Sequence, residues 1–386
     1  MQRLKLVRIT TVPVSLEKLL EGQLRFMSQY YEVCAISSEQ ERLRDYGEKE
    51  GVMTHYVPLT RKITPLRDLA AVWKLYRFCR TYKPAIVHSH TPKAGIVGML
   101  AARLAGVPLR MHTVAGLPLM EASGLKKRIL LAVEKLTYRC AHKVYPNSLG
   151  LKDYILSEGL TTTDKLSVLG EGSSNGIDTD YFDPKNYSEE HSSSTRKQLG
   201  IPESDFVFVF VGRMVKDKGI NELVAAFQQL YQENKAISLL LVGPFEPELD
   251  PVSTETGEAI QSHPKIVTTG YQTDIRSFLS SSDVLVFPSY REGFPNVVMQ
   301  AGAMGLPSIV TDINGCNEII THGVNGLIIP PKNASVLRDT MLEIVENPEL
   351  RRSLAGESRQ RIVARYDRKR MWELILEEYR KVQSGL

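Results

Sequence analysis

The chain has 386 residues, of which 42% are hydrophobic and 24% charged, and its formal net charge is +4. This composition is ordinary for a globular protein, and the length is too great for one core and favours two domains. The four cysteines are scattered, which excludes a zinc site or disulfide framework of paired spacing and predicts a reducing cytosol. The first residues lack the apolar stretch of a signal peptide. The best candidate for a membrane span, 94–109, is too short and contains Arg103.

The positive charge is concentrated in the first half of the chain. Residues 1–180 contain 26 Lys and Arg against 17 Asp and Glu, whereas residues 181–386 contain 22 against 27. A basic half predicts an anionic substrate or surface, and the cluster at 125–128, LKKR, either contacts acidic lipids or forms a solvated helix face. Nucleic acid is not expected as a partner, because the basic residues are not interleaved with stacking aromatics.

Short apolar runs alternate with amphipathic, helix-length stretches such as 65–82 along the first half. The strands expected here are 4–10, 32–37, 85–90, 107–113 and 143–148. After a polar, Ser-rich segment the pattern restarts, with strands expected at 206–212, 238–243, 265–270, 283–289 and 306–311. This alternation predicts parallel sheets wrapped by helices, that is, an α/β protein with two Rossmann-like, doubly wound domains facing a cleft.

The expected domain bounds follow from the composition. We expect a first domain over 1–183, a linker at 184–198 and a second domain over 199–365. The closing segment, 366–386, is expected to be a helix that packs back on the first domain.

The stretch 206–219, FVFVFVGRMVKDKG, reads as a buried strand, a Gly turn and two spaced cations, Arg213 and Lys218. A guanidinium and an ammonium beside the start of a helix suit a diphosphate. The alternative is that both are solvated loop cations.

The stretch 291–305, REGFPNVVMQAGAMG, joins a strand to a helix. Gly293 permits the turn, and Pro295 suits the first helical turn because it has no N–H to leave unpaired. The amides expected to face an anion are those of Phe294, Asn296 and Val297.

Two polar side chains of this stretch point to a second ligand group. Gln300 can reach back toward the helix start, and Glu292 suits hydroxyl groups rather than phosphate. Cations and amides for phosphates, with a carboxylate and an amide for hydroxyls, describe a nucleotide-sugar site. Alternatively, Glu292 caps the helix and Gln300 packs at a domain contact.

The chain resembles glycosyltransferase family 4, the retaining sugar transferases of GT-B fold. The resemblance covers most of the sequence and rests on GRMVKDKG (212–219), GYQTDI (270–275), PSYREGFPNVVMQAGAMGLPSIVT (288–311), NGIDTDYF (175–182) and VNGLIIPP (324–331). It implies a nucleoside-diphosphate sugar as donor, most readily UDP-linked. Members that build bacterial surface polysaccharides on polyprenyl-diphosphate lipids are the most similar in character.

The resemblance also implies residue roles. Arg213 and Lys218 would hold the donor diphosphate, and the backbone at Gly270 and Tyr271 would line the base. Glu292 would contact the donor sugar as a catalytic residue. The full expected donor set is Gly212, Arg213, Lys218, Gly243, Tyr271, Gly293, Phe294, Pro295, Asn296, Val297 and Gln300. Gln300 departs from the family pattern, which has a second glutamate there for the ribose hydroxyls. The neutral amide could lose roughly 1 kcal/mol of ribose affinity.

In the first domain, His112 is expected to end a strand. By resemblance it would lie beside the donor sugar as a catalytic residue; the alternative is a histidine hydrogen-bonded at a strand end. His88 is expected in the core and His90 at the cleft. Candidate acceptor-binding residues are Pro13, Lys93 and Gly116.

A metal site is not expected. Asp178 and Asp180 mimic a metal-binding DxD motif, but by resemblance they form a structural crossing between the domains. The leaving diphosphate would be neutralised by Arg213, Lys218 and the helix start, so neither a metal nor another cofactor is required.

These inferences predict a hexosyltransferase that moves a sugar from a UDP-sugar to an acceptor hydroxyl with retention of configuration. The acceptor is expected to be a lipid-linked glycan at the cytoplasmic face of the membrane, with the basic domain against the bilayer. Two alternatives remain open: a UDP-sugar epimerase of the same architecture and a non-catalytic nucleotide-sugar-binding protein. A Rossmann oxidoreductase is disfavoured because no GxGxxG follows the first strand.

Overall fold

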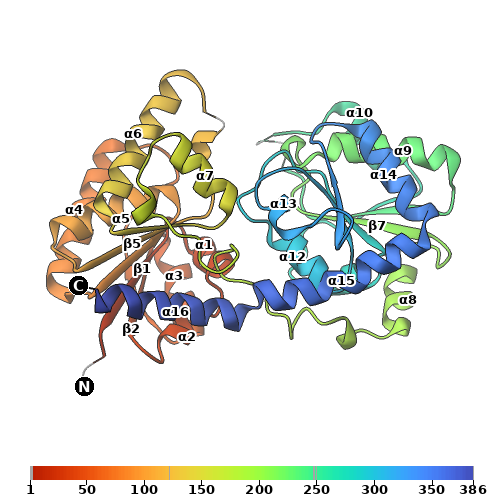
Figure 1. The fold of residues 1–386 in the computed structure, drawn as a ribbon. Coiled ribbons are helices and arrows are strands. Elements are labelled where there is room, and N and C mark those ends of the chain that lie inside the picture. Colours follow the sequence, from red (N-terminus) through yellow and green to blue (C-terminus); the bar gives the residue numbers. More distant parts are fainter. Residues whose placement is uncertain (1–2, 121, 247, 249, 386) are drawn as a thin grey trace. The chain divides into compact units, whose positions relative to one another are not determined.

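The computed structural model describes residues 3–120, 122–246, 248 and 250–385. The chain forms two units, each with its own sheet (Figure 1). Unit 1 comprises Met1–Gly176 and Arg368–Leu386, and unit 2 comprises Ile177–Asp367.

Unit 1 is a parallel six-stranded sheet in the order β3-β2-β1-β4-β5-β6. Its strands are β1 (Lys5–Ile9), β2 (Glu32–Ser37), β3 (Met53–Tyr56), β4 (Ile86–His90), β5 (Leu109–Val114) and β6 (Lys143–Pro146). Its α-helices are α1 (Pro13–Leu19), α2 (Gln23–Met27), α3 (Gln40–Glu50), α4 (Pro65–Tyr82), α5 (Pro92–Leu104), α6 (Gly124–Cys140), α7 (Leu149–Ser157) and α16 (Arg368–Ser384), with 3-10 turns η1 (Pro118–Met120) and η2 (Thr163–Lys165).

The sheet of unit 1 is buried on both faces because its strands carry apolar residues in both alternating sets. Val7 and Ile9 face a core completed by α4, α5, α6 and α7. Leu6 faces a second core, to which α1, α2, α3 and α16 contribute. Helix α16 therefore belongs structurally to unit 1, where Met371, Ile375 and other apolar residues of one face are buried.

Unit 2 repeats this design, with the strand order β12-β11-β10-β7-β8-β9. Its strands are β7 (Phe206–Val211), β8 (Ile237–Val242), β9 (Ile266–Thr268), β10 (Val284–Phe287), β11 (Ser308–Thr311) and β12 (Gly326–Ile329). Its helices are α8 (Glu189–Gln198), α9 (Ile220–Glu233), α10 (Thr254–Ser262), α11 (Arg276–Ser280), α12 (Asn296–Ala303), α13 (Cys316–Ile319), α14 (Ala334–Glu346) and α15 (Pro348–Tyr366), with 3-10 turns η3 (Pro184–Asn186) and η4 (Lys216–Lys218). Figure 1 shows α9, α10 and α14 on one side of this sheet and α8, α12 and α15 on the other.

Both units are Rossmann-like, because each winds outward in both directions from its first strand. The order reverses between β1 and β4 in unit 1 and between β7 and β10 in unit 2. Ligands of such sheets bind beyond the carboxyl ends of the strands at this switch point. The topology thus directs attention to the loops after β7 and β10.

Two expectations about the organisation of the chain were wrong. The segment 184–198 is not a linker: Ser188 caps α8 by accepting from the His191 amide at 3.2 Å, and Arg196 bonds Asp283 at 3.0 Å. Acidic residues in the first turn and basic ones in the last also favour this helix. The first domain does not extend to 183, because Ile177 is buried in unit 2 and its amide donates to the carbonyl of Tyr366 at 2.8 Å.

Candidate functional site

The loops that follow β7 and β10 bring two of the expected donor residues into contact. Nζ of Lys218 lies 2.5 Å from Oε1 of Glu292, and the Ser289 hydroxyl donates to the same oxygen at 3.0 Å. Only 14% of the Lys218 side chain and 17% of the Glu292 side chain are exposed. A cation and a carboxylate 74 residues apart thus form one partly buried ion pair at the switch point.

Arg213 also has an acidic partner, which sequence reasoning missed. Its Nη1 lies 3.0 Å from Oε2 of Glu246, in the loop after β8, and both side chains are about one-third exposed or more. Each expected diphosphate cation is therefore paired with a carboxylate. The site is less positive than its two cations suggest.

Glycines allow the loops at the carboxyl ends to approach one another. Gly243 follows β8 with φ 144°, and a Cβ there would lie 1.8 Å from the carbonyl oxygen of Gly212, the residue after β7. Gly219 follows Lys218 with φ 71°, and its Cβ would lie 2.1 Å from the Pro288 carbonyl oxygen. Neither position accepts a side chain, so these turns hold the ends of β7, β8 and β10 together.

The helix expected at the phosphate site is α12, but it begins one residue later than predicted. Pro295 is the N-cap with φ −75° and ψ 110°, rather than a residue of the first turn. The Val298 amide donates to the Pro295 carbonyl at 3.2 Å. The amides of Asn296 and Val297 occupy the first two positions, where a helix supplies no backbone acceptor.

Gly293 and Phe294 lie just before α12, and what they contribute to the expected phosphate site is their backbone rather than side chains. The Phe294 ring is buried against Tyr366, with centroids 5.4 Å apart. Nδ2 of Asn314, in the loop after β11, donates to the carbonyls of Glu292 and Gly293 at 3.1 and 2.7 Å. Asn314 was missed; its only signal in the sequence is the polar turn DING after an apolar run.

Gln300 lies one turn beyond Asn296 on the half-buried face of α12, so its side chain leans toward the helix start. Tyr271 is 62% exposed and follows Gly270, which forms a β-bridge with Gly243. The residues expected at the base therefore adjoin those expected at the diphosphate.

The position of His112 differs from the prediction. It lies inside β5 rather than at its end, is 2% exposed, and its Nδ1 is 2.9 Å from the Ser89 hydroxyl. A Cβ on Gly95 of α5 would lie 2.6 Å from its ring. Burial lowers the pKa of His112 to about 4, so the ring is neutral near pH 7. His112 is thus buried and hydrogen-bonded within the sheet of unit 1, and its expected role beside the donor sugar stays a prediction.

Two of the three acceptor-side candidates, Pro13 and Lys93, lie after β1 and β4, at the switch point of unit 1. Pro13 is buried at the start of α1, and the hydroxyls of Thr11 and Thr91 meet at 2.7 Å between β1 and β4. Lys93, however, forms an ion pair with Asp68 of α4 and is only 11% exposed. Gly116 lies half-buried just after β5.

The remaining residues that the sequence singled out are two histidines of β4 and the acidic segment at 178–180. His88 is buried as expected, but His90 is also buried, at 1% exposed, and does not face solvent. Asp178 accepts from the Tyr181 amide at 3.0 Å and Thr179 donates to Asp367 at 2.7 Å. Among the described residues, no group of three or more His, Cys, Asp or Glu side chains could hold a metal ion.

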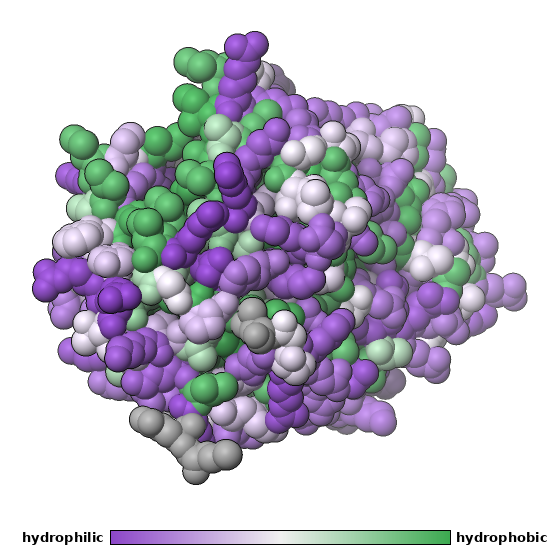
Figure 2. All heavy atoms as spheres, turned by 60° about the vertical axis from the view of Figure 1, so that its left-hand side comes forward, coloured by the Kyte–Doolittle hydropathy of each residue, from purple (hydrophilic) through white to green (hydrophobic). Residues whose placement is uncertain are grey.

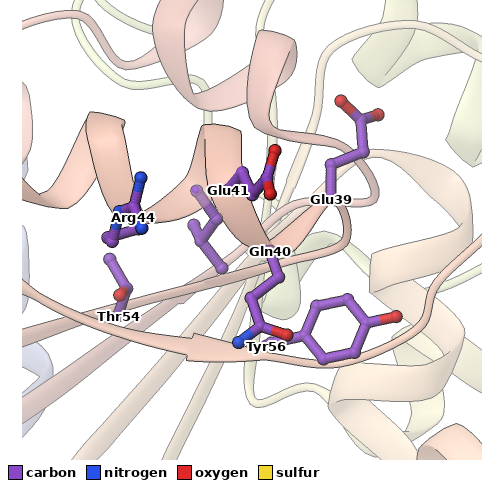
Figure 3. Close-up of a pocket in the computed structure, with 7 residues that line it drawn as sticks. Glu39, Gln40, Glu41, Arg44, Thr54 and Tyr56 are labelled. Atoms are coloured by element: carbon purple, nitrogen blue, oxygen red, sulfur yellow. The ribbon is translucent and has the colours of Figure 1, made fainter.

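One surface hollow lies away from all these residues. It is a pocket between the start of α3 and β3 in unit 1 (Figure 3), and its volume is about 720 Å³. Its labelled side chains are Glu39, Gln40, Glu41, Arg44, Thr54 and Tyr56. Both carboxylates and the guanidinium are solvent-exposed, and the pocket contains no residue predicted for donor or acceptor.

Comparison with known proteins identifies the family. The model of the family "Glycosyl transferases group 1" matches residues 192–361, and that of the "Glycosyl transferase 4-like domain" matches 20–170. The chain is 31% identical over 380 residues to the capsular polysaccharide biosynthesis glycosyltransferase CapM of Staphylococcus aureus, covering 98% of this chain and 97% of that protein.

Two further relatives are informative. An Escherichia coli UDP-Gal:alpha-D-GlcNAc-diphosphoundecaprenol alpha-1,3-galactosyltransferase is 28% identical over 355 residues, 89% of each chain. The crystal structure of Anabaena Alr3699/HepE in complex with UDP matches all of both chains with TM-score 0.83 and 20% identity, which shows a common fold. The chain therefore belongs to the group 1 glycosyltransferases, family 4 enzymes of GT-B fold, and is a hexosyltransferase.

Proposed function

We propose that this enzyme transfers a hexose from a UDP-sugar to a lipid-linked glycan during synthesis of a surface polysaccharide, with retention of configuration. The observation that carries the donor part is the Lys218–Glu292 pair beside the start of α12, at the switch point of unit 2. Support for donor and acceptor comes from relatives named for a UDP-sugar donor, for diphosphoundecaprenol-linked acceptors and for capsular polysaccharide.

In this proposal the diphosphate lies between Arg213, Lys218 and the free amides of Asn296 and Val297. In the structure the carboxylates of Glu246 and Glu292 neutralise the two cations. The diphosphate either replaces these carboxylates or binds the cations together with them. Whether or not Glu292 keeps its contact with Lys218, its carboxylate accepts hydrogen bonds from hydroxyls of the donor sugar. Gln300 accepts from the ribose, and the backbone near Gly270 and Tyr271 lines the base.

The transfer step is proposed to proceed on the front side of the sugar. The bond from the anomeric carbon to the diphosphate oxygen breaks while the acceptor oxygen bonds to the same carbon. The acceptor's proton passes to the departing diphosphate oxygen. The two cations and the helix amides stabilise the charge that develops there, and we propose that no metal is needed.

A donor-turnover assay tests this function. Slow UDP release from one UDP-sugar, lost in Lys218→Ala but kept in Lys216→Ala, is the expected result. Lys216 is a matched control because it lies in the same turn and is exposed. Isomerised sugar would instead indicate an epimerase, and tight UDP-sugar binding without turnover would indicate a binding protein.

The acceptor proposal requires access to a membrane, and unit 1 offers a suitable surface. Leu66, Leu69 and Trp73 are 86%, 66% and 60% exposed along one face of α4, and Leu125 and Ile129 are 73% and 45% exposed on α6. Both helices pack on α5. Figure 2, in which the side of Figure 1 that shows unit 1 comes forward, shows apolar side chains among hydrophilic ones.

The charge of this surface is complementary to an acidic bilayer. Its exposed basic residues are Arg61, Lys62, Arg67, Lys74, Arg77, Lys126, Arg128 and Lys135. Of the acidic residues in α4 and α6, Asp68 is paired with Lys93 and Glu134 is buried. No helix in the described part of the chain is long and apolar enough to cross a membrane. We therefore propose peripheral binding on the cytoplasmic side.

Vesicle sedimentation tests the membrane surface. The protein should bind phosphatidylglycerol-containing vesicles at low salt and not pure phosphatidylcholine. The double variant Leu69→Ser/Trp73→Ser should lose binding, whereas Val363→Ser, an exposed apolar position of α15 in unit 2, should keep it. Equal binding by both variants would contradict this surface.

A further inference from the structure

A buried guanidinium lies in the central part of the sheet of unit 1, and none of the hydrogen-bond partners that the described residues give it is a carboxylate. Arg8 of β1 is 0% exposed. Its Nη1 donates to the Tyr379 hydroxyl at 2.9 Å, and its Nη2 donates to Oε1 of Gln23 at 2.6 Å and contacts Nε2 of His90 at 2.7 Å. All these partners are neutral groups. A buried charge without an opposite charge is costly.

The hydrogen-bond directions in this cluster follow from the donor-only chemistry of arginine. Because Nη2 of Arg8 can only donate, Nε2 of His90 must accept, and the proton of the neutral imidazole lies on Nδ1. Burial and the charge of Arg8 hold the pKa of His90 well below its usual range, so the ring is neutral. Nδ1 of His90 is therefore an N–H donor.

The remaining partners are accounted for in the same way. Tyr379 accepts from Arg8 and so can donate to Nδ1 of His88, 2.6 Å away. Nε2 of His88 then donates to the Thr113 hydroxyl at 2.8 Å. Tyr379 and His88 are thus fully engaged with their neighbours.

Several polar atoms around one small cavity have no partner. Arg8, His90, Asn147 and Ser174 all line a cavity of about 10 Å³. The buried atoms Nε of Arg8, Nδ1 of His90, Oδ1 of Asn147 and Oγ of Ser174 each lack a hydrogen-bond partner among the residues that the structure describes. Two of them are N–H donors and a third is a hydroxyl, while the residues that line the cavity include no carboxylate.

We infer that this cavity binds a single small anion, of the size and charge of chloride, which neutralises Arg8. The cavity has on the order of the space that one water needs, so a phosphate is too large for it. The anion would accept from Arg8, His90 and Ser174. This site is separate from the proposed donor site, which lies in unit 2.

Such an anion would stabilise the segments where the chain enters and leaves unit 1. Gln23, held by Arg8, donates to the Ser174 carbonyl at 3.1 Å and to Oδ1 of Asn175 at 2.9 Å. Trp372 of α16 donates to the same Asn175 oxygen at 2.6 Å. The network around Arg8 thus joins β1, the end of the first segment of unit 1 and α16.

Diffraction from crystals grown in bromide tests the site directly. An anomalous bromine peak between Arg8 and His90 is expected, and a water molecule or an empty cavity there would overturn the inference. In solution, unfolding is compared in chloride and gluconate at equal ionic strength and pH. Chloride at 100 times its Kd should lower the unfolding equilibrium constant of unit 1 by about 100-fold. Equal stability in the two salts would contradict the site.

A charge-substitution variant sharpens the solution test. Asn147→Asp is isosteric and supplies a carboxylate at the cavity, so the variant should be as stable in gluconate as in chloride. Asn333→Asp is the matched control, because Asn333 caps α14 in unit 2 through Oδ1, a role that aspartate also fills. The control should keep the chloride dependence of the unsubstituted protein. If Asn147→Asp does not fold, the bromide experiment alone decides.

Discussion

Lys218 and Glu292 form a partly buried ion pair, so each side chain determines what the other is free to bind. The sequence alone predicts that the cation binds the diphosphate and that the carboxylate binds the sugar, as two independent groups. In the structure they share a contact of 2.5 Å. The loss of one partner leaves the other charge half-buried and uncompensated. Substitutions at the two positions should therefore have opposite effects on nucleotide binding.

Glu292→Ala should tighten UDP binding by about 3- to 10-fold, because Lys218 is released to the phosphates, and should lower turnover by at least about 100-fold. Calorimetric titration of UDP and a turnover assay measure the two effects. Glu246→Ala, which releases the more exposed Arg213, is the control and should tighten UDP binding by about 5-fold or less with turnover retained. Weaker UDP binding in Glu292→Ala would place the phosphates elsewhere.

Gln300→Glu should leave the enzyme active and tighten UDP binding by up to about 5-fold, the equivalent of roughly 1 kcal/mol. Gln300 lies on the same face of α12 as Asn296, one turn from the helix start. A charged acceptor there would bind ribose hydroxyls more strongly. Deoxyuridine diphosphate, which lacks the 2′-hydroxyl, should show a smaller gain. Complete loss of activity would mean that the ribose does not lie beside this residue.

Glu134 makes the stability of unit 1 depend on pH. It is 4% exposed in α6, and burial raises its pKa to about 7. The folded state then binds more protons than the unfolded state between pH 4.5 and 7, so this contribution to the free energy of unfolding is lost as pH rises. Glu134→Gln should remove the loss and stabilise unit 1 at pH 8 by up to roughly 3 kcal/mol. Urea unfolding from pH 5 to 8 measures it.

The control for this pH effect is Glu158→Gln. The hydrogen bond from Lys127 lowers the pKa of Glu158, so its contribution is lost only as pH falls below the usual carboxyl range. The Glu158→Gln substitution should not change how the free energy of unfolding varies with pH between pH 5 and 8. An unchanged slope in Glu134→Gln would show that Glu134 is ionised in the folded protein.

At the scale of the elements, α16 joins the end of the chain to unit 1. It follows α15 directly in the chain, yet its apolar face completes a core of unit 1. The apolar spacing of this helix is visible in the sequence, as expected for a helix that packs on a domain. Its partner residues on β1, α1 and α2 are hundreds of positions away and are supplied only by the fold.

Ile375→Ala should lower the free energy of unfolding of unit 1 by about 2–4 kcal/mol, because this side chain is 4% exposed and leaves a cavity against β1 and α2. Val363→Ala in α15, where the side chain is 38% exposed, should cost less than about 0.5 kcal/mol. Urea unfolding followed by hydrogen exchange locates the loss. A loss confined to unit 2 would contradict the assignment of α16.

At the scale of the whole molecule, two units with separate cores predict two separable unfolding events. The expected donor-binding residues all lie in unit 2, at the carboxyl ends of β7, β8, β9 and β10. UDP at 100 times its Kd should stabilise unit 2 by about 2.7 kcal/mol. The hydrogen-exchange rates of the amides in unit 1 should not change. Hydrogen exchange with and without UDP measures this. Protection confined to unit 1 would overturn the proposed donor site.

The sequence determined those features that depend on residues close together in the chain. Apolar runs such as 206–211 and the helical spacing of 65–82 predicted most strands and helices, because burial on both faces of a parallel sheet requires continuous apolar residues. The short edge strands β3 and β12 were missed. In β3 the ends, Met53 and Tyr56, are exposed, so no apolar run marks it. The turns that carry Arg213, Lys218 and Glu292 could also be predicted from local sequence motifs.

Only the tertiary structure decided which of these side chains meet and which are buried. The pairing of Arg213 with Glu246, the core position of His112 and the burial of His90 beside Arg8 depend on strands that are distant in sequence. A histidine within an alternating strand looks the same whether its face is covered or open. Local sequence specifies conformation through short-range sterics and hydrophobic spacing. Ion pairing and desolvation depend on which distant segments fold against each other, and no single stretch contains that information.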